Sequence, residues 1–133
     1  MLRAIKSGAI LEHTHVSSRD VYYGTYKPDL DKKFSEGKVV ITNPDVVGAK
    51  FYKEHHSPTT ILVVPGSMEE LRGRIKKRDS SITEEEIDKR MQQAEEEVTN
   101  ERGFYDYEVV NADEKLEEAI EEVVDILKKE KYL

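Results

Sequence analysis

Three arginines in the second half of the chain have a spacing that could bring positive charge to phosphate groups. Arg74 and Arg78 stand four residues apart, which places them on one face of a helix, and Arg90 follows on the next predicted helix. Guanidinium groups bind phosphate oxygens through paired hydrogen bonds. Because glutamates are frequent on the same helices, the arginines could equally pair with neighbouring acids. The pattern indicates either a phosphate-binding lid or a charged helix surface.

A carboxylate near the N-terminus, Glu12, could recognise a nucleobase. An ionised carboxylate only accepts hydrogen bonds, so it can take two parallel bonds from the amidine edge of guanine, a pattern that adenine does not offer. The alternative is that Glu12 is a surface acid and that Tyr22 and Tyr23 are ordinary strand aromatics. His13, His15, His55 and His56 have no carboxylate at a matching metal-ligand spacing, and we expect them to be surface residues rather than a zinc site.

The composition limits the class of protein. The chain has 133 residues, a formal net charge of -7 and no cysteine. Without cysteine there is no disulfide or zinc-thiolate site, which suits a cytoplasmic protein. The negative charge argues against sequence-independent nucleic-acid binding, and no apolar stretch approaches the roughly 20 residues of a membrane helix. We expect one cytoplasmic domain over residues 1–133 that binds neither nucleic acid nor membrane.

The elements that must position these residues follow an α/β pattern. Three short β-branched runs read as buried parallel strands, and the segments between them have helical patterns. The strands are predicted at 38–41, 59–64 and 107–110. Helices are predicted at 27–37, 45–52, 67–77 and 83–101, and from residue 113 onward. Residues 9–16 and 21–25 alternate enough to predict an antiparallel hairpin.

Local signals predict where several helices begin and end. Ser67 stands three residues before Glu70, and Thr83 three residues before Glu86, so each pair predicts a capping box at a helix N-terminus. Gly37 predicts a glycine cap at the end of its helix. In the last helix, residues Leu116, Ala119, Ile120, Val123, Ile126 and Leu127 predict an apolar face that packs on the sheet.

Four stretches together resemble the guanylate kinase family in order and spacing, from about residue 2 to residue 127. They are Gly8-x-x-Leu11-Glu12, Tyr22-Tyr23-Gly24-Thr25, Leu71-x-x-Arg74-Ile75-x-x-Arg78 and Tyr105-Asp106-Tyr107-x-Val109-Val110-Asn111. The resemblance implies a P-loop-kinase-like parallel sheet flanked by helices, with a small GMP-binding β region. It also implies a GMP-binding region at about 1–36, a core remainder at about 37–133 and a lid at about 74–95.

The resemblance assigns roles to individual residues. It implies that Glu12 recognises guanine, that the Thr25 hydroxyl binds the same base and that Tyr23 donates its phenol to the monophosphate. Asn43 stands where the family usually has an aspartate, Asp45 follows it, and both are implied to lie at the GMP site. For phosphoryl transfer, the resemblance implies Arg74, Arg78 and Arg90 as lid arginines, and Asn111 near the adenine of ATP.

The sequence departs from the family in three ways. No Gly-x-x-x-x-Gly-Lys-Ser/Thr motif occurs, so the phosphate-loop strand of such kinases is not represented. Asn43 is neutral where a carboxylate is usual. The Ser17-Ser-Arg-Asp stretch lengthens the hairpin, and Arg19 could replace a phosphate-binding arginine.

The expected function is therefore a guanylate-kinase-like nucleotide-binding domain, related to ATP-dependent phosphorylation of GMP to GDP but inactive alone. An active form would use Mg²⁺ with ATP. Two alternatives stay open: a non-catalytic protein-interaction module, and an N-terminally truncated active guanylate kinase. Because one edge of the sheet lacks a strand, we also expect a homo-oligomer or a partner subunit that covers it.

Overall fold

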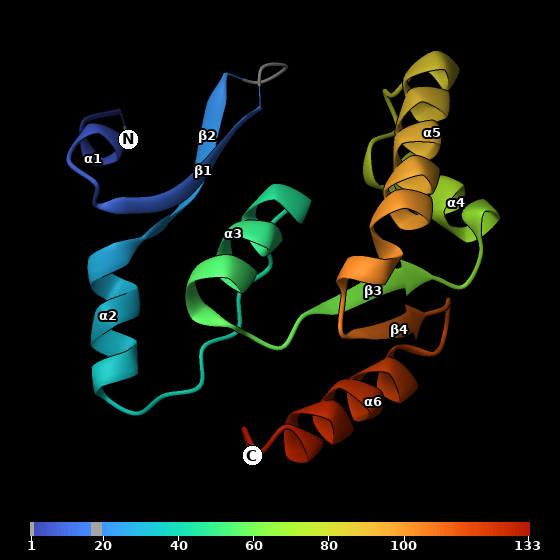
Figure 1. Cartoon of the computed structure of the whole chain (residues 1–133). Helices are drawn as coiled ribbons and strands as arrows, with labels where there is room; N and C mark the ends of the chain where they lie inside the picture. Colours follow the sequence, from blue (N-terminus) through green and yellow to red (C-terminus); the bar gives the residue numbers. More distant parts are fainter. Residues whose placement is uncertain (1, 17–19) are drawn as a thin grey trace. The chain divides into compact units, whose positions relative to one another are not determined.

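The computed structural model describes residues 2–16 and 20–133, and its internal contacts divide the chain into two compact units (Figure 1). The first unit is Met1–Pro58 and the second is Thr59–Leu133. The predicted single domain, divided near residue 36, stays a prediction. Arg19 and the Ser17-Ser18 part of the predicted insertion lie outside the described residues.

The first unit contains the predicted antiparallel hairpin and three helices. Its elements are α1 (Leu2–Lys6), β1 (Ile10–Val16), β2 (Val21–Tyr26), α2 (Lys27–Ser35) and α3 (Val46–His56). β1 pairs with β2, and Thr14 lies opposite Tyr23 in the register. The hairpin, the helix after it and the helix after Asp45 are confirmed, whereas α1 was not predicted.

Gly24 allows the two strands of the hairpin to approach closely where Glu12 lies. A Cβ atom at Gly24 would stand 2.5 Å from the Glu12 carbonyl oxygen and 2.8 Å from the Ile10 Cγ2 atom. Contacts this short do not occur for real Cβ atoms, so the pairing requires glycine. The glycine of the Tyr22-Tyr23-Gly24-Thr25 motif thus fixes the position of Glu12 relative to β2.

The prediction of a strand at 38–41 is wrong. The backbone there forms neither strand nor helix, and the side chains of Val39 and Ile41 are 45% and 75% exposed. A β-branched run becomes a strand only when a neighbouring backbone supplies hydrogen bonds. In the described part of the chain the two sheets are β1–β2 and β3–β4, and neither includes this run.

The second unit is built on a pair of parallel strands, as predicted. β3 (Ile61–Pro65) pairs with β4 (Tyr107–Asn111), and Val63 lies opposite Val109. Between the strands the chain forms α4 (Met68–Arg78), α5 (Glu84–Glu101) and the 3-10 helix η1 (Arg102–Phe104), and α6 (Leu116–Lys129) follows β4. The α/β class predicted from the sequence is confirmed.

The core of the second unit lies between β4 and α6. Val109, Ala119 and Ile126 are buried there, with Ile61, Tyr107 and Val123 packed against them. Figure 1 shows α6 along one side of the strand pair and α4 and α5 on the other. Leu116 and Ile120 were predicted for the packed face of α6 but are 58% and 52% exposed. Two strands are too narrow to cover the whole apolar face of a helix this long.

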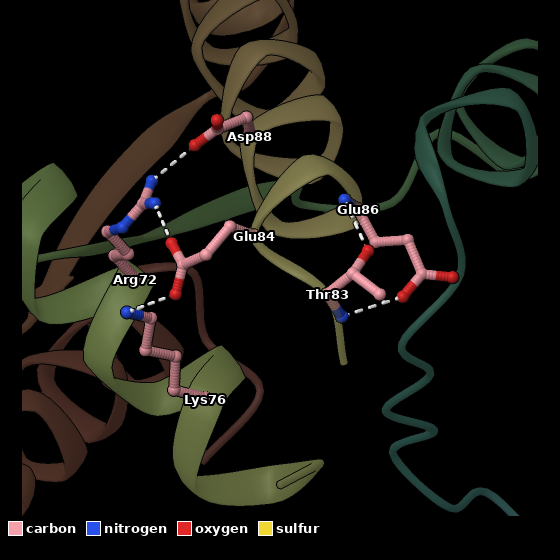
Figure 2. Close-up of polar contacts among 6 residues, drawn as sticks. All are labelled: Arg72, Lys76, Thr83, Glu84, Glu86 and Asp88. Carbon is pink, nitrogen blue, oxygen red and sulfur yellow. Dashed lines mark hydrogen bonds and ion pairs between the residues drawn. The ribbon is translucent and has the colours of Figure 1, made fainter. Parts of the chain in front are cut away.

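The predicted helix caps form, one of them only in part. The Thr83 hydroxyl accepts from the Glu86 N–H, and the Glu86 carboxylate accepts from the Thr83 N–H, a complete capping box (Figure 2). Ser67 accepts from the Glu70 N–H at 3.1 Å, but the Glu70 carboxylate accepts from the Asp113 N–H instead. Glu70 therefore joins α4 to the segment after β4 rather than closing the box.

Gly37 ends the α2 region as predicted, with a φ of +69° that favours glycine. Among residues 2–16 and 20–133, none of the helices combines the length and apolar character that crossing a membrane requires.

Candidate nucleotide-binding site

A pocket of about 380 Å³ lies in the first unit, at the face of the hairpin near the N-terminus of α3. It gathers five of the residues proposed from the sequence for GMP: Glu12, Tyr23, Thr25, Asn43 and Asp45. The remaining lining residues are Thr14, Gly24, Thr42 and Pro44. Sequence reasoning did not single out Thr14 or Thr42 as site residues, because a hydroxyl on a strand or a loop is too common to be a signal.

The Glu12 carboxylate is held by hydroxyl groups on one of its two oxygens. The Thr25 hydroxyl donates to Glu12 Oε1 at 2.9 Å, and the Tyr52 hydroxyl lies 3.5 Å from the same atom. Two hydroxyl contacts on Oε1 leave Oε2 as the oxygen with fewer partners. The geometry thus presents an oriented, acceptor-only group to the pocket.

Tyr52 is a residue of this site that sequence reasoning missed. It belongs to α3, is 6% exposed and is not among the residues that line the pocket. Burial raises the pKa of its phenol, and the neighbouring Glu12 charge adds to the rise. No sequence signal could have found it, because Tyr52 stands forty residues from Glu12 and only folding brings them together.

Both carboxylate oxygens of Asp45 accept hydrogen bonds from other groups of the protein. Oδ1 accepts from the Gly48 N–H at 2.9 Å and so caps α3, while Oδ2 accepts from the Thr14 hydroxyl at 2.8 Å. This pair of bonds ties the N-terminus of α3 to β1. Asp45 therefore orders the wall of the pocket, and Asn43 beside it is exposed.

Gly48 lets the first turn of α3 pack against Glu12. A Cβ atom there would lie 2.7 Å from the Pro44 Cβ atom and 3.3 Å from Glu12 Oε2. The absence of a side chain at the buried Gly48 thus leaves room for the Glu12 carboxylate beside the first turn of α3. Tyr23 also lines the pocket. Its side chain is 58% exposed, so it is accessible to a ligand that enters from solvent.

The predicted lid arginines differ in their surroundings. Arg74 donates to Asp113 from Nε at 2.8 Å and to the Asn111 carbonyl from Nη2 at 2.7 Å, which joins α4 to the end of β4. Arg78 and Arg90 are exposed, and within the described part of the chain no carboxylate forms an ion pair with either. Asn111 is half-buried at the carboxyl end of β4.

A cluster of charges joins α4 to α5 (Figure 2). Arg72 donates to Glu84 at 2.6 Å and to Asp88 at 2.7 Å, and Lys76 pairs with Glu84 at 2.6 Å. Lys76 and then Arg72 lower the pKa of the Glu84 carboxyl, and Asp88 and Glu84 raise the pKa of Arg72. Among the three arginines proposed from the sequence, the alternative of pairing with acids is realised at Arg74, which forms ion pairs with Asp113 and Glu70. Arg72 on the same helix pairs with acids of α5 in the same way.

The four histidines are exposed, as expected from the sequence. His15 Nε2 lies 2.9 Å from the Asp20 carboxylate, and His55 Nδ1 lies 2.8 Å from the Phe51 carbonyl oxygen. Within residues 2–16 and 20–133, no group of three or more His, Cys, Asp or Glu side chains is arranged to hold a metal ion.

Known proteins similar to this chain are guanylate kinases. The guanylate kinase from Caldanaerobacter subterraneus subsp. tengcongensis is 42% identical over 130 residues, which is 97% of this chain and 60% of that protein. The enzyme from Clostridium tetani is 38% identical over 128 residues, 96% of this chain and 59% of that protein. The crystal structure of guanylate kinase from Anaplasma phagocytophilum matches with a TM-score of 0.72 at 28% identity, covering 97% of this chain and 59% of that one.

The chain thus spans about 60% of the length of the relatives that it matches. The family model for guanylate kinase matches residues 1–130, nearly the whole chain. The four sequence stretches that resemble the family all lie inside that match, and the chain belongs to the guanylate kinase family.

Proposed function

We propose that the first unit binds GMP in the pocket between the hairpin and the N-terminus of α3. The observation that carries this proposal is the convergence of Glu12, Thr25 and Tyr23 with Asn43 and Asp45 on one cavity of about 380 Å³. The residues come from β1, β2 and the segment before α3, and each has a polar group suited to a nucleotide.

Base selection is assigned to Glu12. The guanine N1–H and 2-amino group form two adjacent donors, and a carboxylate accepts both. Adenine presents an acceptor at N1, so it would face the Glu12 oxygens with a lone pair. The Thr25 hydroxyl, already bonded to Glu12 Oε1, lies beside the same ligand position and is proposed to contact the base.

The phosphate end is assigned to Tyr23 and the segment before α3. The exposed Tyr23 phenol is a donor, and the Asn43 amide is another. Asp45 contributes indirectly, because its carboxylate is used to cap α3 and to hold Thr14.

Phosphoryl transfer from ATP with Mg²⁺ is proposed as the reaction to which this binding site belongs, with Arg78 and Arg90 supplying charge to the phosphates and Asn111 near the adenine. Arg74 is proposed to act with them, although here it is engaged with Asp113. The 133 residues contain no Walker motif, so we expect them to bind GMP with negligible turnover. A longer form with a phosphate-binding loop would transfer phosphate to the same bound GMP.

Titration calorimetry of the 133-residue chain with GMP and with AMP tests the binding proposal. We expect GMP to bind and AMP to bind about tenfold more weakly or worse. Glu12→Ala removes two hydrogen bonds to a charged group, each worth about 1.5–3 kcal/mol, and should weaken GMP binding by about 100-fold or more. Glu54→Ala, an exposed acid on α3, is the matched control and should leave GMP binding unchanged.

Equal binding of GMP and AMP, or no effect of Glu12→Ala, would refute the base assignment. A coupled assay of ADP release with ATP and GMP tests the second part, and rapid turnover by this chain alone would refute the expected inactivity.

A further inference from the structure

We propose that Tyr52 is a positioning residue for base selection, whose buried hydroxyl holds the Glu12 carboxylate in the orientation that reads the guanine edge. The proposal rests on the GMP site proposed above. It assigns a role to a side chain that does not touch the ligand position.

The Tyr52 hydroxyl contacts Glu12 from a buried side chain that does not line the pocket. Tyr52 is 6% exposed and lies outside the set of lining residues, yet its hydroxyl is 3.5 Å from Glu12 Oε1. Thr25 donates to that same oxygen at 2.9 Å and does line the pocket. One oxygen of Glu12 thus has a hydroxyl contact from a pocket-lining residue and another from a buried residue outside the lining.

The Tyr52 ring is buried and lies beside two other rings of its helix. It makes an edge contact with Phe51, with ring centroids 5.7 Å apart, and a tilted contact with His56 at 6.0 Å. Its helix also carries Gly48, where an added Cβ atom would lie only 3.3 Å from Glu12 Oε2. α3 therefore contacts Oε1 through the Tyr52 hydroxyl, and Gly48 on the same helix leaves the space beside Oε2 open.

A fixed orientation of the Glu12 carboxylate matters most for a base that donates hydrogen bonds to both of its oxygens. When a base enters the pocket, Thr25 can turn its hydroxyl toward it, whereas Tyr52 is buried and does not line the pocket. Tyr52 then remains to hold Oε1. Guanine needs two acceptors aligned in its plane, so loss of this hydroxyl should penalise guanine more than a base that offers one donor.

Hypoxanthine is that base, because IMP has the N1–H of GMP but lacks the 2-amino group. The test measures dissociation constants of GMP and IMP for the wild-type chain and for Tyr52→Phe, which removes only the hydroxyl. We expect Tyr52→Phe to weaken GMP about fivefold and IMP less than about twofold, so that the preference for GMP over IMP falls.

Tyr26→Phe is the matched control, since Tyr26 is 53% exposed at the end of β2 and should leave both constants unchanged. Circular dichroism first establishes that each variant is folded. If Tyr52→Phe does not fold, Tyr52→Met supplies a smaller, flexible apolar side chain without a hydroxyl and carries the same expectation.

An unchanged GMP-to-IMP ratio in the folded variant overturns the proposal. So does an equal loss for both nucleotides, because a merely structural role would weaken them alike. Failure of the GMP site itself is distinguishable, since the wild-type chain would then bind neither nucleotide.

Discussion

Asp106, in the middle of the Tyr105-Asp106-Tyr107 motif, aligns the beginnings of the two parallel strands. Its Oδ2 atom accepts from both the backbone N–H and the hydroxyl of Thr60, each at 2.8 Å. The Asp106 N–H in turn donates to the Thr60 hydroxyl at 3.1 Å. Thr60 is 7% exposed, so these bonds satisfy polar groups that water cannot reach. A motif that identified the family by resemblance thus has a structural role in this unit.

Removal of this carboxylate should destabilise the second unit. We expect Asp106→Ala to lower the free energy of unfolding by about 3 kcal/mol, because it removes two charge-assisted hydrogen bonds to donors of the buried Thr60. Urea denaturation measures the loss. Asp125→Ala, an exposed acid on α6, is the control and should change stability little. Equal stabilities of the two variants would show that Asp106 does not hold the strands.

At the scale of elements, the α4–α5 corner depends on a cap that the sequence predicted. Thr83→Ala removes the hydroxyl that accepts from the Glu86 N–H and should cost about 1 kcal/mol of stability. Thermal unfolding followed by circular dichroism measures it. Thr99→Ala, an exposed change within α5, should raise stability slightly, because no cap is lost and alanine favours a helix more than threonine does. Equal melting temperatures of the two threonine variants would exclude a capping role for Thr83.

The charge cluster at the same corner should make stability depend on pH and salt. The pKa of Glu84 lies below its ordinary value of 4.5, since Lys76 and Arg72 favour the charged form. The stabilisation is therefore present above about pH 4.5 and is lost as the pH falls through the lowered pKa. We expect Glu84→Gln to lower Tm slightly at neutral pH, by less at high salt, and to match the wild type in acid.

Melting curves at several pH values and salt concentrations check this expectation. Glu95→Gln on the same helix is the control, since Glu95 is exposed and forms no ion pair in the described part of the chain. The same pH-dependent difference in both variants would contradict a specific role for Glu84.

The elements differ in how well local sequence predicts them. The capped helices and the hairpin follow from the sequence because a cap or an alternating pattern acts within a few residues. The run at 38–41 has the composition of a buried strand but forms none, because a strand also needs a partner that its own residues cannot supply. The packed face of α6 is also smaller than its sequence predicts: Leu116 and Ile120 have the periodicity of a packed face, yet both are more than half exposed.

At the scale of the whole molecule, each unit exposes apolar side chains. Ile41 is 75% exposed in the first unit, and Val63 and Val110 are 57% and 48% exposed in the second. β3 and β4 form a sheet of only two strands, so each has an unpaired edge within the described residues. Such surfaces favour association with another chain.

We therefore expect the 133-residue chain to self-associate as its concentration rises, measured by light scattering coupled to size exclusion. Val63→Lys should reduce the association by placing a charge on the β3 strand. Leu2→Lys, which changes an exposed residue of α1, serves as the control. A monodisperse monomer at all concentrations would contradict the expectation.

The sequence by itself determined the family, the α/β class and five residues that line one pocket, because motifs and caps are local patterns. Tertiary structure alone decided which groups hold Glu12. Tyr52 contacts that carboxylate, and Gly48 leaves room for it, from a helix that is distant in sequence. Arg72 rather than Arg78 pairs with the acids of α5. These contacts depend on how the elements pack. Packing brings residues into contact that are far apart in the sequence, and neither their types nor their spacing predicts the contact.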